Sequence, residues 1–361
     1  MTQSVLHVEG QIWVGPHEVR GELWILDGRI TFTAPTSGSV QSVRGHVLPG
    51  LVDAHAHVGL ESTGAVGPER AEAHAIANRD AGALLIRDAG SPADTRWVQE
   101  REDLPRLIRA GRHIARPRRY LPGYAHEIEP EQLAEYVRLE ARQGDGWVKL
   151  VGDWIDRGTG DLGPLWPREH LIAAVAAAHE EGARTTAHCF GEESLHDFAA
   201  AGTDCIEHAS GLDEESTKAF AAQGIAIVPT LINIANFPDL AAPARDKFPV
   251  YYAHMLAIHA RRYETIARAH EAGIPIYVGT DAGGVLPHGL AAKEAAELAK
   301  AGLSTIDVLA AGSWAARSWL GHPGIDEGDP ADLVVYPADP RLDLAVLGAP
   351  ESIVLRGNHV R

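Results

Sequence analysis

The sequence predicts an α/β fold in which a parallel β/α barrel carries a small β lobe. Short apolar runs alternate with Ala-rich helical patterns from about residue 48 to residue 320, and both ends of the chain are rich in strand patterns instead. Repeated strand–helix alternation indicates parallel strands joined by helices that cover the outside. An open, doubly wound sheet produces the same periodicity and stays the alternative.

The two ends of the chain predict the small lobe. Short strand patterns fill the N-terminal part, and Asp27-Gly28 between two of them is a hairpin signal because both residues tolerate positive φ. The C-terminal end returns to strand patterns separated by turn residues. We therefore expect a β-sandwich lobe composed of residues 1–48 and 323–361, with the barrel inserted between them at residues 49–322.

The central region supplies the barrel elements. Helical patterns such as Leu171–Glu181 end at a glycine, the residue that most readily adopts the left-handed conformation after a helix. Eight apolar runs are candidate barrel strands: Leu48–Ala54, Ala83–Asp88, Leu107–Ala115, Trp147–Val151, Arg184–Ala187, Asp204–Glu207, Ile225–Val228 and Ile274–Gly279.

Composition excludes several classes of protein. The chain has 361 residues and a formal net charge of −17, which argues against binding to nucleic acid or to an anionic membrane. Two cysteines cannot form a disulfide framework, and no apolar run reaches the length of a membrane span. The first residues lack the pattern of a signal peptide, so we expect none. We expect a cytoplasmic protein whose partner is a small-molecule substrate, and the sequence leaves a homo-oligomer open.

Side chains of the types that commonly bind metals stand at or near the ends of five of the eight runs. Functional groups of a parallel barrel lie at the carboxyl ends of its strands, so these side chains are expected to meet at one end of the sheet. Two of them are two residues apart and can point to the same face of a strand. They are His55 and His57, Lys149, His188, His208 and Asp281.

Each of these residues also has a plain structural explanation. His188 and His208 can be core histidines, Asp281 can cap a helix, and Lys149 within an apolar run can form an ion pair with a neighbouring carboxylate. Two divalent cations explain the set together. A neutral lysine amine can add carbon dioxide, and the resulting carbamate is an anionic oxygen ligand that bridges two metals about 4 Å apart.

The motifs around these residues carry a resemblance to a known family. LPGLVDAHAH at Leu48–His57, VKL at Lys149, TAHCFG at His188, IEHASGLD at His208 and GTDAG at Asp281 occur in the order found in the amidohydrolase superfamily, and DPADLVVY resembles its returning strand. The resemblance is greatest to imidazolonepropionase-like and zinc-prolidase-like members and covers nearly the whole chain. It implies a distorted (β/α)8, or TIM, barrel.

The resemblance also implies a ligand set and a reaction. His55, His57 and Asp281 would hold one metal, His188 and His208 the other, and carboxylated Lys149 would bridge them, with zinc as the expected ion. Metal-bound hydroxide would attack the substrate, while Asp281 accepts the proton and passes it to the leaving amine. The implied function is hydrolysis of a C–N bond in a small amide, cyclic amide or N-acyl amino acid, not of the linear peptide bonds of proteins.

Other readings of the sequence stay open at this point. The same metal site can catalyse cyclisation, condensation or decarboxylation, because one fold hosts many reactions. A barrel that has lost catalysis, or a Schiff-base role for Lys149, is disfavoured by the intact set of ligand candidates.

Substrate residues are expected in the loops after the strands. The segment after the third run contains several arginines, which suit a substrate carboxylate but can equally form a solvated turn. It ends in Tyr124-Ala125-His126, where the family usually has Gly-Gly-His, and a second departure from the family, Gly328-Asp329 in place of Gly-Lys, is cosmetic. The candidates are His126, as a second catalytic residue and substrate contact, and Tyr120, Trp154 and His288, as substrate contacts.

Overall fold

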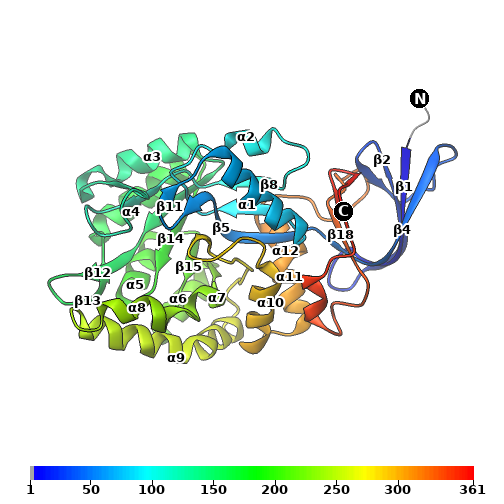
Figure 1. The fold of residues 1–361 in the computed structure, drawn as a ribbon. Coiled ribbons are helices and arrows are strands. Elements are labelled where there is room, and N and C mark those ends of the chain that lie inside the picture. Colours follow the sequence, from blue (N-terminus) through cyan, green and yellow to red (C-terminus); the bar gives the residue numbers. More distant parts are fainter. Residues whose placement is uncertain (1–3) are drawn as a thin grey trace.

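The computed structural model describes residues 4–361 and places a β lobe at one end of a larger α/β body (Figure 1). Both ends of the chain contribute to the lobe, while the α/β body is formed by the residues between them. No helix in the described part of the chain is both long and apolar enough to cross a membrane.

The lobe is a seven-stranded sheet in the order β20-β19-β18-β4-β1-β2-β3. Its strands form one hydrogen-bonded sheet rather than the two sheets of the expected sandwich, and an apolar cluster that includes Val8, Leu23 and Leu333 packs on it. Asp27 and Gly28, both at positive φ, make the expected hairpin turn. The strands are β1 (Ser4–Trp13), β2 (Val19–Leu26), β3 (Arg29–Thr31), β4 (Ser39–Pro49), β18 (Leu333–Tyr336), β19 (Ser352–Leu355) and β20 (Asn358–His359).

Two curled, largely parallel sheets form the centre of the α/β body. The first has the order β17-β5-β7-β8, with the short β6 paired to β5, and comprises β5 (Leu51–Glu61), β6 (Gly64–Ala65), β7 (Ala83–Asp88), β8 (Arg106–Arg109) and β17 (Ala282–Gly284). The second has the order β10-β9-β11-β14-β15-β16 and comprises β9 (His113–Ala115), β10 (Ala125–Glu127), β11 (Trp147–Val151), β14 (Arg184–Cys189), β15 (Cys205–His208) and β16 (Ala226–Val228).

The eighth predicted run, Ile274–Gly279, is not a regular strand. Pro275 lacks the N–H group that a ladder requires, and Ile276 makes only an isolated bridge to Ile227. Tyr277 still donates its N–H to the carbonyl of Ile227, and Ala54 donates to the carbonyl of Val278. The segment therefore lies between the last strand of one sheet and β5 of the other.

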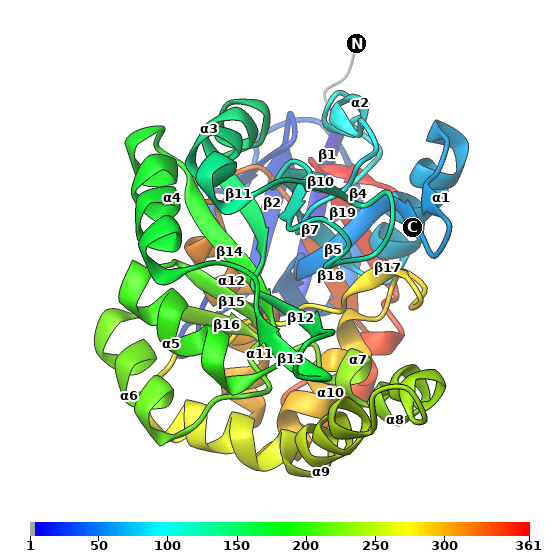
Figure 2. The ribbon, with the colours of Figure 1, turned by 90° about the vertical axis from the view of Figure 1, so that its left-hand side faces the viewer.

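Helices cover the outside of the two sheets, as Figure 2 shows for α3 to α6 and α9. Those of the first half are α1 (Pro68–Asp80), α2 (Arg96–Gln99), α3 (Leu133–Gln143), α4 (Arg168–Glu180), α5 (Glu192–Ala201) and α6 (Glu214–Gln223). The second half contains α7 (Leu231–Ile234), α8 (Phe237–Ala241), α9 (Pro249–Glu271), α10 (Ala291–Lys300), α11 (Thr305–Gly312) and α12 (Trp314–Trp319). Short 3-10 turns occur at Pro130–Gln132, Ala242–Ala244 and Leu344–Gly348.

A buried ion pair joins the lobe to the α/β body. Arg317 of α12 lies 3.1 Å from Asp332, which precedes β18, and both side chains are fully buried. Arg317 also donates to the carbonyls of Gly50 and Pro323. Gly50 stands where the chain passes from β4 to β5, and a Cβ there would lie 2.6 Å from Leu84. The passage between the two parts is thus closely packed.

Candidate metal centre

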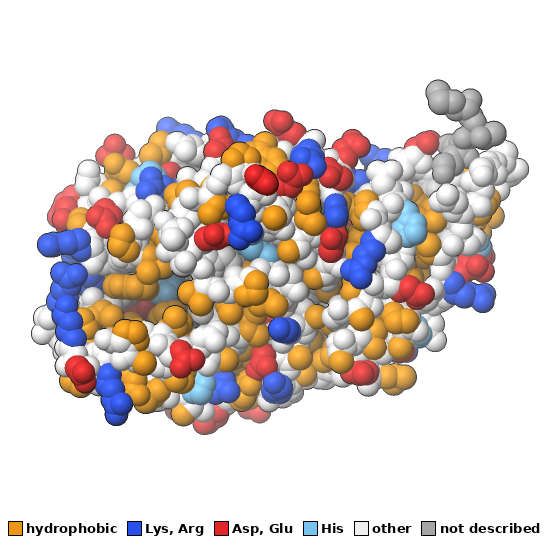
Figure 3. Space-filling model, in the orientation of Figure 1, with side chains coloured by type: hydrophobic (Ala, Val, Ile, Leu, Met, Phe, Trp, Pro, Cys, Tyr) orange, Lys and Arg blue, Asp and Glu red, His pale blue; other side chains and the backbone are white. Residues whose placement is uncertain are grey.

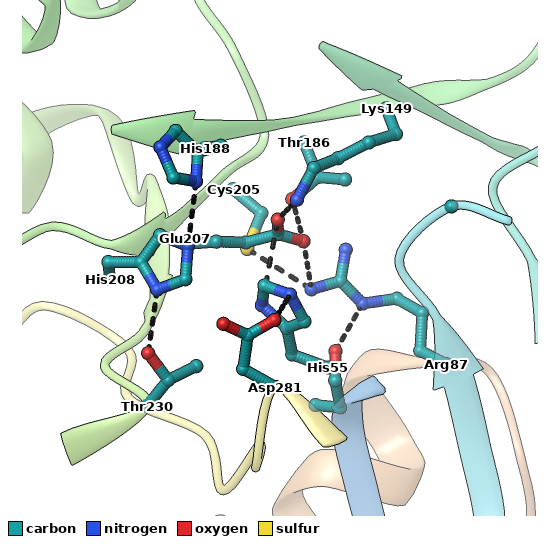
Figure 4. Close-up of polar contacts among 12 residues, drawn as sticks. His55, Arg87, Lys149, Thr186, His188, Cys205, Glu207, His208, Thr230 and Asp281 are labelled. Carbon is teal, nitrogen blue, oxygen red and sulfur yellow. Dashed lines mark hydrogen bonds and ion pairs between the residues drawn. The ribbon is translucent and has the colours of Figure 1, made fainter. Parts of the chain in front are cut away.

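The structure brings all six predicted metal ligands to one end of the curled sheets, where they line one cavity. Figure 4 shows five of them, all but His57. The two histidines of the first motif lie on β5, Lys149 lies on β11, and the next two histidines lie on β14 and β15. Asp281 comes directly before β17. The end-of-strand rule for parallel sheets therefore placed these residues correctly, although they are up to 226 positions apart in the chain (281 − 55).

The first group of ligand atoms surrounds one point. The Nε2 atoms of His55 and His57 lie 3.1 Å apart, and each lies 3.0 Å from Oδ1 of Asp281. His57 is oriented by the carbonyl of Gly90, 2.6 Å from its Nδ1, so that its Nε2 faces the other two residues. Three donor atoms that converge in this way are suited to a metal ion.

A second group adjoins the first. Nδ1 of His188 lies 3.0 Å from Nε2 of His208, and the other nitrogen of His208 lies 2.6 Å from Oγ1 of Thr230. Nε2 of His188 is buried without a hydrogen-bond partner. Ligand atoms of His55, His208 and Asp281 all lie within 4.8 Å of one another, so the two groups are contiguous.

Lys149 is fully buried and its Nζ contacts the carboxylate of Glu207. Glu207 has three further partners. Its Oε1 lies 3.3 Å from Nη2 of Arg87 and accepts a hydrogen bond of 2.9 Å from Thr186. Its other oxygen lies 3.5 Å from Nδ1 of His55 (Figure 4). The amine thus has the carboxylate partner that the plain structural explanation expects, and it still lines the same cavity as the histidines.

Burial sets the protonation states of the ligands. It lowers the pKa of His55 and His208 well below the usual range and that of His188 to about 3, so these imidazoles are neutral at pH 7. Burial also lowers the pKa of Lys149 to about 7. For Asp281, burial opposes ionisation, but the neighbouring His55 and His57 keep the pKa well below its usual value. Neutral imidazole and ionised carboxylate are the forms that bind metals.

Backbone conformation decides where two of the ligands point. His208 has φ 68° and Asp281 has φ 57°, both in the left-handed region. At β15 this breaks the strand alternation, so that Glu207 and His208, although adjacent, both reach the site. Left-handed residues other than glycine are costly and cluster at functional sites.

The residues present fit a pair of divalent cations. The set offers imidazole nitrogens and a carboxylate, which suit zinc, and two groups of ligand atoms instead of one. Two neutral imidazoles can share only one proton between facing nitrogens, and the second nitrogen of His188 has no hydrogen-bond partner, with Oδ1 of Asp153 3.8 Å away. Cations would satisfy these donor atoms together.

A cavity of about 520 Å³ opens beside the ligands, and hydrophobic side chains border a hollow at the left-hand end of Figure 3. Two of the predicted substrate residues, Tyr120 and Trp154, line it. Their rings pack edge to face at 5.0 Å, and Trp154 lies on the hairpin of β12 (Asp153–Asp156) and β13 (Asp161–Pro164). Oδ2 of Asp281 accepts a 2.7 Å hydrogen bond from Asn233 at the cavity wall.

The other two predicted substrate residues lie elsewhere. Nε2 of His126 is 2.9 Å from the buried carboxylate of Glu140, and its ring packs on Tyr136. His288 stacks on His74 at 4.3 Å and contacts Asn78. Neither side chain lines the cavity. The structure therefore does not support a catalytic role for His126 or substrate contacts for either histidine, because polar partners outside the cavity hold both rings.

The arginines of the segment after the third run also contact groups outside the cavity. Arg112 donates to the carbonyls of Gly123 and Tyr124, and Arg116 pairs with Glu129. Arg119 holds the β12–β13 hairpin through Asp156 and two backbone carbonyls. No arginine lines the cavity among the described residues, so this segment has a structural role.

Sequence reasoning missed the residues that support the ligands. Glu207 directly precedes a predicted ligand, and strand alternation would point it away from the site. Arg87 lies inside a fully buried strand, where an arginine without a carboxylate partner is costly. Its position in an apolar run could therefore have indicated a buried carboxylate nearby. Thr230 and Asn233 depend on the short helix α7, whose first N–H groups bind the buried carboxylate of Glu294. No local sequence pattern predicts this contact between α7 and Glu294.

His254 of α9 ties the hairpin to the helices beside the cavity. Its ring nitrogens lie 2.9 Å from Asp161 of the hairpin and 2.9 Å from Glu192 of α5, and Glu192 also pairs with Arg261. The hydrogen bond with Glu192 is the main cause that raises the pKa of His254 to about 9. Because the folded pKa lies above that of the unfolded chain, the stabilisation is complete below about pH 6.5 and is lost as the pH rises through about 9.

We expect His254→Gln to lower the free energy of unfolding more at about pH 6 than at about pH 10. The sign follows from the raised pKa, since only protonated His254 pairs with both carboxylates. Chemical denaturation of wild type and variant at both pH values measures the difference. A difference that does not change with pH would show that His254 contributes no charge to this contact.

Comparisons with known proteins agree with this geometry. The model of the Amidohydrolase family matches residues 46–357. Uncharacterized protein Rv2915c of Mycobacterium tuberculosis (strain ATCC 25618 / H37Rv) is 51% identical over 355 residues, which cover 98% of this chain and 95% of that protein. A Xaa-Pro dipeptidase with bound methionine superposes with a TM-score of 0.83 at 22% identity over 99% of both chains. A. niger ochratoxinase superposes with a TM-score of 0.81 at 20% identity, over 100% of this chain and 96% of that protein. The two structural likenesses establish the fold alone.

Proposed function

Since the chain belongs to the amidohydrolase family, we propose that it is a binuclear metal-dependent hydrolase that cleaves a C–N bond of a small molecule. The observation that carries the proposal is the pair of adjoining ligand groups, one around Oδ1 of Asp281 and one at His188 and His208. A cavity of about 520 Å³, suited to a small molecule and not to a folded protein, opens beside them.

The ligand assignment follows the two groups. His55, His57 and Asp281 would hold one cation and His188 and His208 the other, with zinc as the expected ion. We infer that Lys149, carboxylated at Nζ, would supply oxygen donors to both cations. The ammonium form first releases one proton; the neutral amine then forms an N–C bond to carbon dioxide and releases a second proton, so the cationic side chain becomes an anionic oxygen donor. When bound, such cations supply a water molecule of lowered pKa and a Lewis acid for the substrate carbonyl.

The protein's own groups would then move the protons. Asp281 accepts a proton from the attacking water through its carboxylate and returns it to the nitrogen of the leaving amine. Asn233 holds Oδ2 of Asp281 at 2.7 Å, which keeps Oδ1 directed at the two histidines. Tyr120 and Trp154 wall the cavity and exclude water from one side of the substrate.

We also propose that the two curled sheets and segment 274–278 together make a distorted eight-stranded barrel. The hydrogen bonds of this segment to Ile227 on one side and to Ala54 on the other support closure there. The loop at Ala110–Arg112 would be a break within a single strand that comprises β8 and β9. Closure explains why ligands from both sheets meet at one end.

Elemental analysis of protein purified without chelators tests the metal centre. About two divalent ions per chain are expected, because two groups of ligands are present. His188→Ala should lower the content, whereas the matched controls His126→Ala and His288→Ala should not, because both histidines lie outside the cavity. Wild-type content clearly below one ion per chain would refute the binuclear site. Hydrolysis is tested by identifying products from amides, lactams and N-acyl amino acids.

A further inference from the structure

We propose that the site accepts an uncharged substrate with a bulky apolar group and selects against a carboxylate beside the scissile C–N bond. This inference rests on the proposed function and narrows it, since N-acyl amino acids carry such a carboxylate. It is derived from the charges and the apolar surfaces of the cavity, which are independent of the metal ligands.

The cavity offers no free cation near the metal centre. Apart from the ligand histidines, the charged side chains that line it within residues 4–361 are Lys149, Asp281 and Lys247. Lys149 contacts Glu207, and Asp281 is directed at His55 and His57, so neither side chain offers a free positive charge. Lys247 is exposed, and its Nζ lies 5.2 Å from the ring centre of Phe248. A carboxylate beside the reacting bond would therefore lose water without gaining a side-chain cation as its partner.

Two polar side chains of the cavity are committed to other contacts as well. Asn233 donates to Asp281, and the hydroxyl of Tyr124 donates to the carbonyl of Glu61 at 2.7 Å. The arginines that could have recognised a carboxylate hold the loop and the hairpin instead. No arginine of the described residues is therefore left to form a charged pair with an anionic group next to the metal centre.

Apolar surface makes up most of the remaining wall. Near His188, the rings of Tyr120, Trp154 and Phe190 lie within 4.2–5.8 Å of the imidazole, measured between ring centres. Leu240 and Met255 add aliphatic surface from α8 and α9. Such walls favour apolar groups by about 25 cal/mol for each Å² removed from water.

The mouth of the cavity is apolar too. Leu121, Leu240 and Val285 line it and are 40%, 41% and 68% exposed. Large exposed apolar side chains that gather at one opening mark a binding surface for apolar ligands. They come from three separate segments, so their proximity is a property of the folded cavity and not of one apolar stretch of sequence.

A matched pair of compounds tests the inference. N-benzoylpyrrolidine and N-benzoyl-L-proline share the aryl amide and differ only in the carboxylate beside the scissile bond. We expect calorimetry to show that the metal-loaded protein binds the neutral compound at least about tenfold more tightly, and kcat/KM to follow the same order where turnover occurs. Equal or tighter binding of the proline compound would overturn the inference.

Two variants connect the preference to the cavity wall. Trp154→Ala should weaken binding of the neutral compound about tenfold, and Trp154→Phe should restore most of it. Trp97→Ala, a partly buried tryptophan of α2 that lies outside the cavity, is the matched control and should leave the affinity unchanged. Unchanged affinity in Trp154→Ala would also overturn the inference.

The binding readout separates this inference from the proposed function. Tight binding of the neutral compound without hydrolysis of any amide in the panel would refute hydrolysis and leave the substrate preference intact. Hydrolysis of amides with a preference for substrates that carry a carboxylate would support the proposed function and refute the substrate preference. Failure of both would appear as weak binding together with an absence of products.

Discussion

Replacing Asp281 with asparagine is expected to lower kcat by at least about a hundredfold, because the amide keeps the shape of the side chain but cannot accept a proton. Asparagine also tolerates the left-handed backbone at this position, φ 57°, so the fold should survive. Steady-state kinetics and metal analysis on the same preparation measure the effect. The loss should appear in kcat and kcat/KM together, since the proton transfer belongs to the transition state.

A matched control shows whether an Asp→Asn substitution lowers kcat at any position or only at the metal centre. Asp197→Asn removes a carboxylate whose partner is Arg168 on the surface, and we expect kcat to stay within about twofold. An Asp281→Asn variant that retains both metals and normal turnover would show that a different group carries the proton. Tyr120, whose ring lies in the same cavity, would then be the next residue to test.

Replacing Lys149 with alanine is expected to lower kcat at least about a hundredfold and to lower metal content, since the bridging donor is lost. The fold should persist, because the buried carboxylate of Glu207 retains Arg87 at 3.3 Å and Thr186 at 2.9 Å. Circular dichroism and metal analysis accompany the assay. Short carboxylic acids added with bicarbonate should restore part of the activity by occupying the position of the carbamate.

The contact with Glu207 allows a sharper version of this test. If Lys149 served only to neutralise Glu207, Lys149→Arg would retain activity and metal content, because the guanidinium keeps a positive charge beside that carboxylate but does not form a carbamate. We expect Lys149→Arg to lose both. Full activity and metal content in this variant would refute the bridging role.

The strands of the α/β body followed closely from local patterns. Ala83–Asp88 and Trp147–Val151 begin and end where the apolar runs do, because short strands buried on both faces are continuous apolar segments. The run at Leu107–Ala115 is divided between β8 and β9, and Ile274–Gly279 makes isolated pairings only. Pro275 explains the latter, since a missing N–H prevents a regular ladder.

The loops behaved differently from the strands. His126 matched a family position yet turns to Glu140, and His288 followed a ligand yet stacks on His74. The arginines of the same region bind carbonyls and carboxylates that are distant in sequence. A loop side chain takes its direction from partners that the tertiary structure supplies, and periodicity contains no information about them.

What the sequence alone determines here is the order of strands and helices, the identity of the six candidate ligands and the end of the sheet at which they stand. Strand polarity makes that possible, because residues at the carboxyl ends of parallel strands converge wherever the strands pack side by side. Tertiary structure decided what surrounds those ligands. His208 reaches the site because its backbone adopts φ 68°, and the cavity has no arginine in its wall because the nearby arginines have partners elsewhere. Both outcomes depend on contacts between segments far apart in the chain, which no local pattern records.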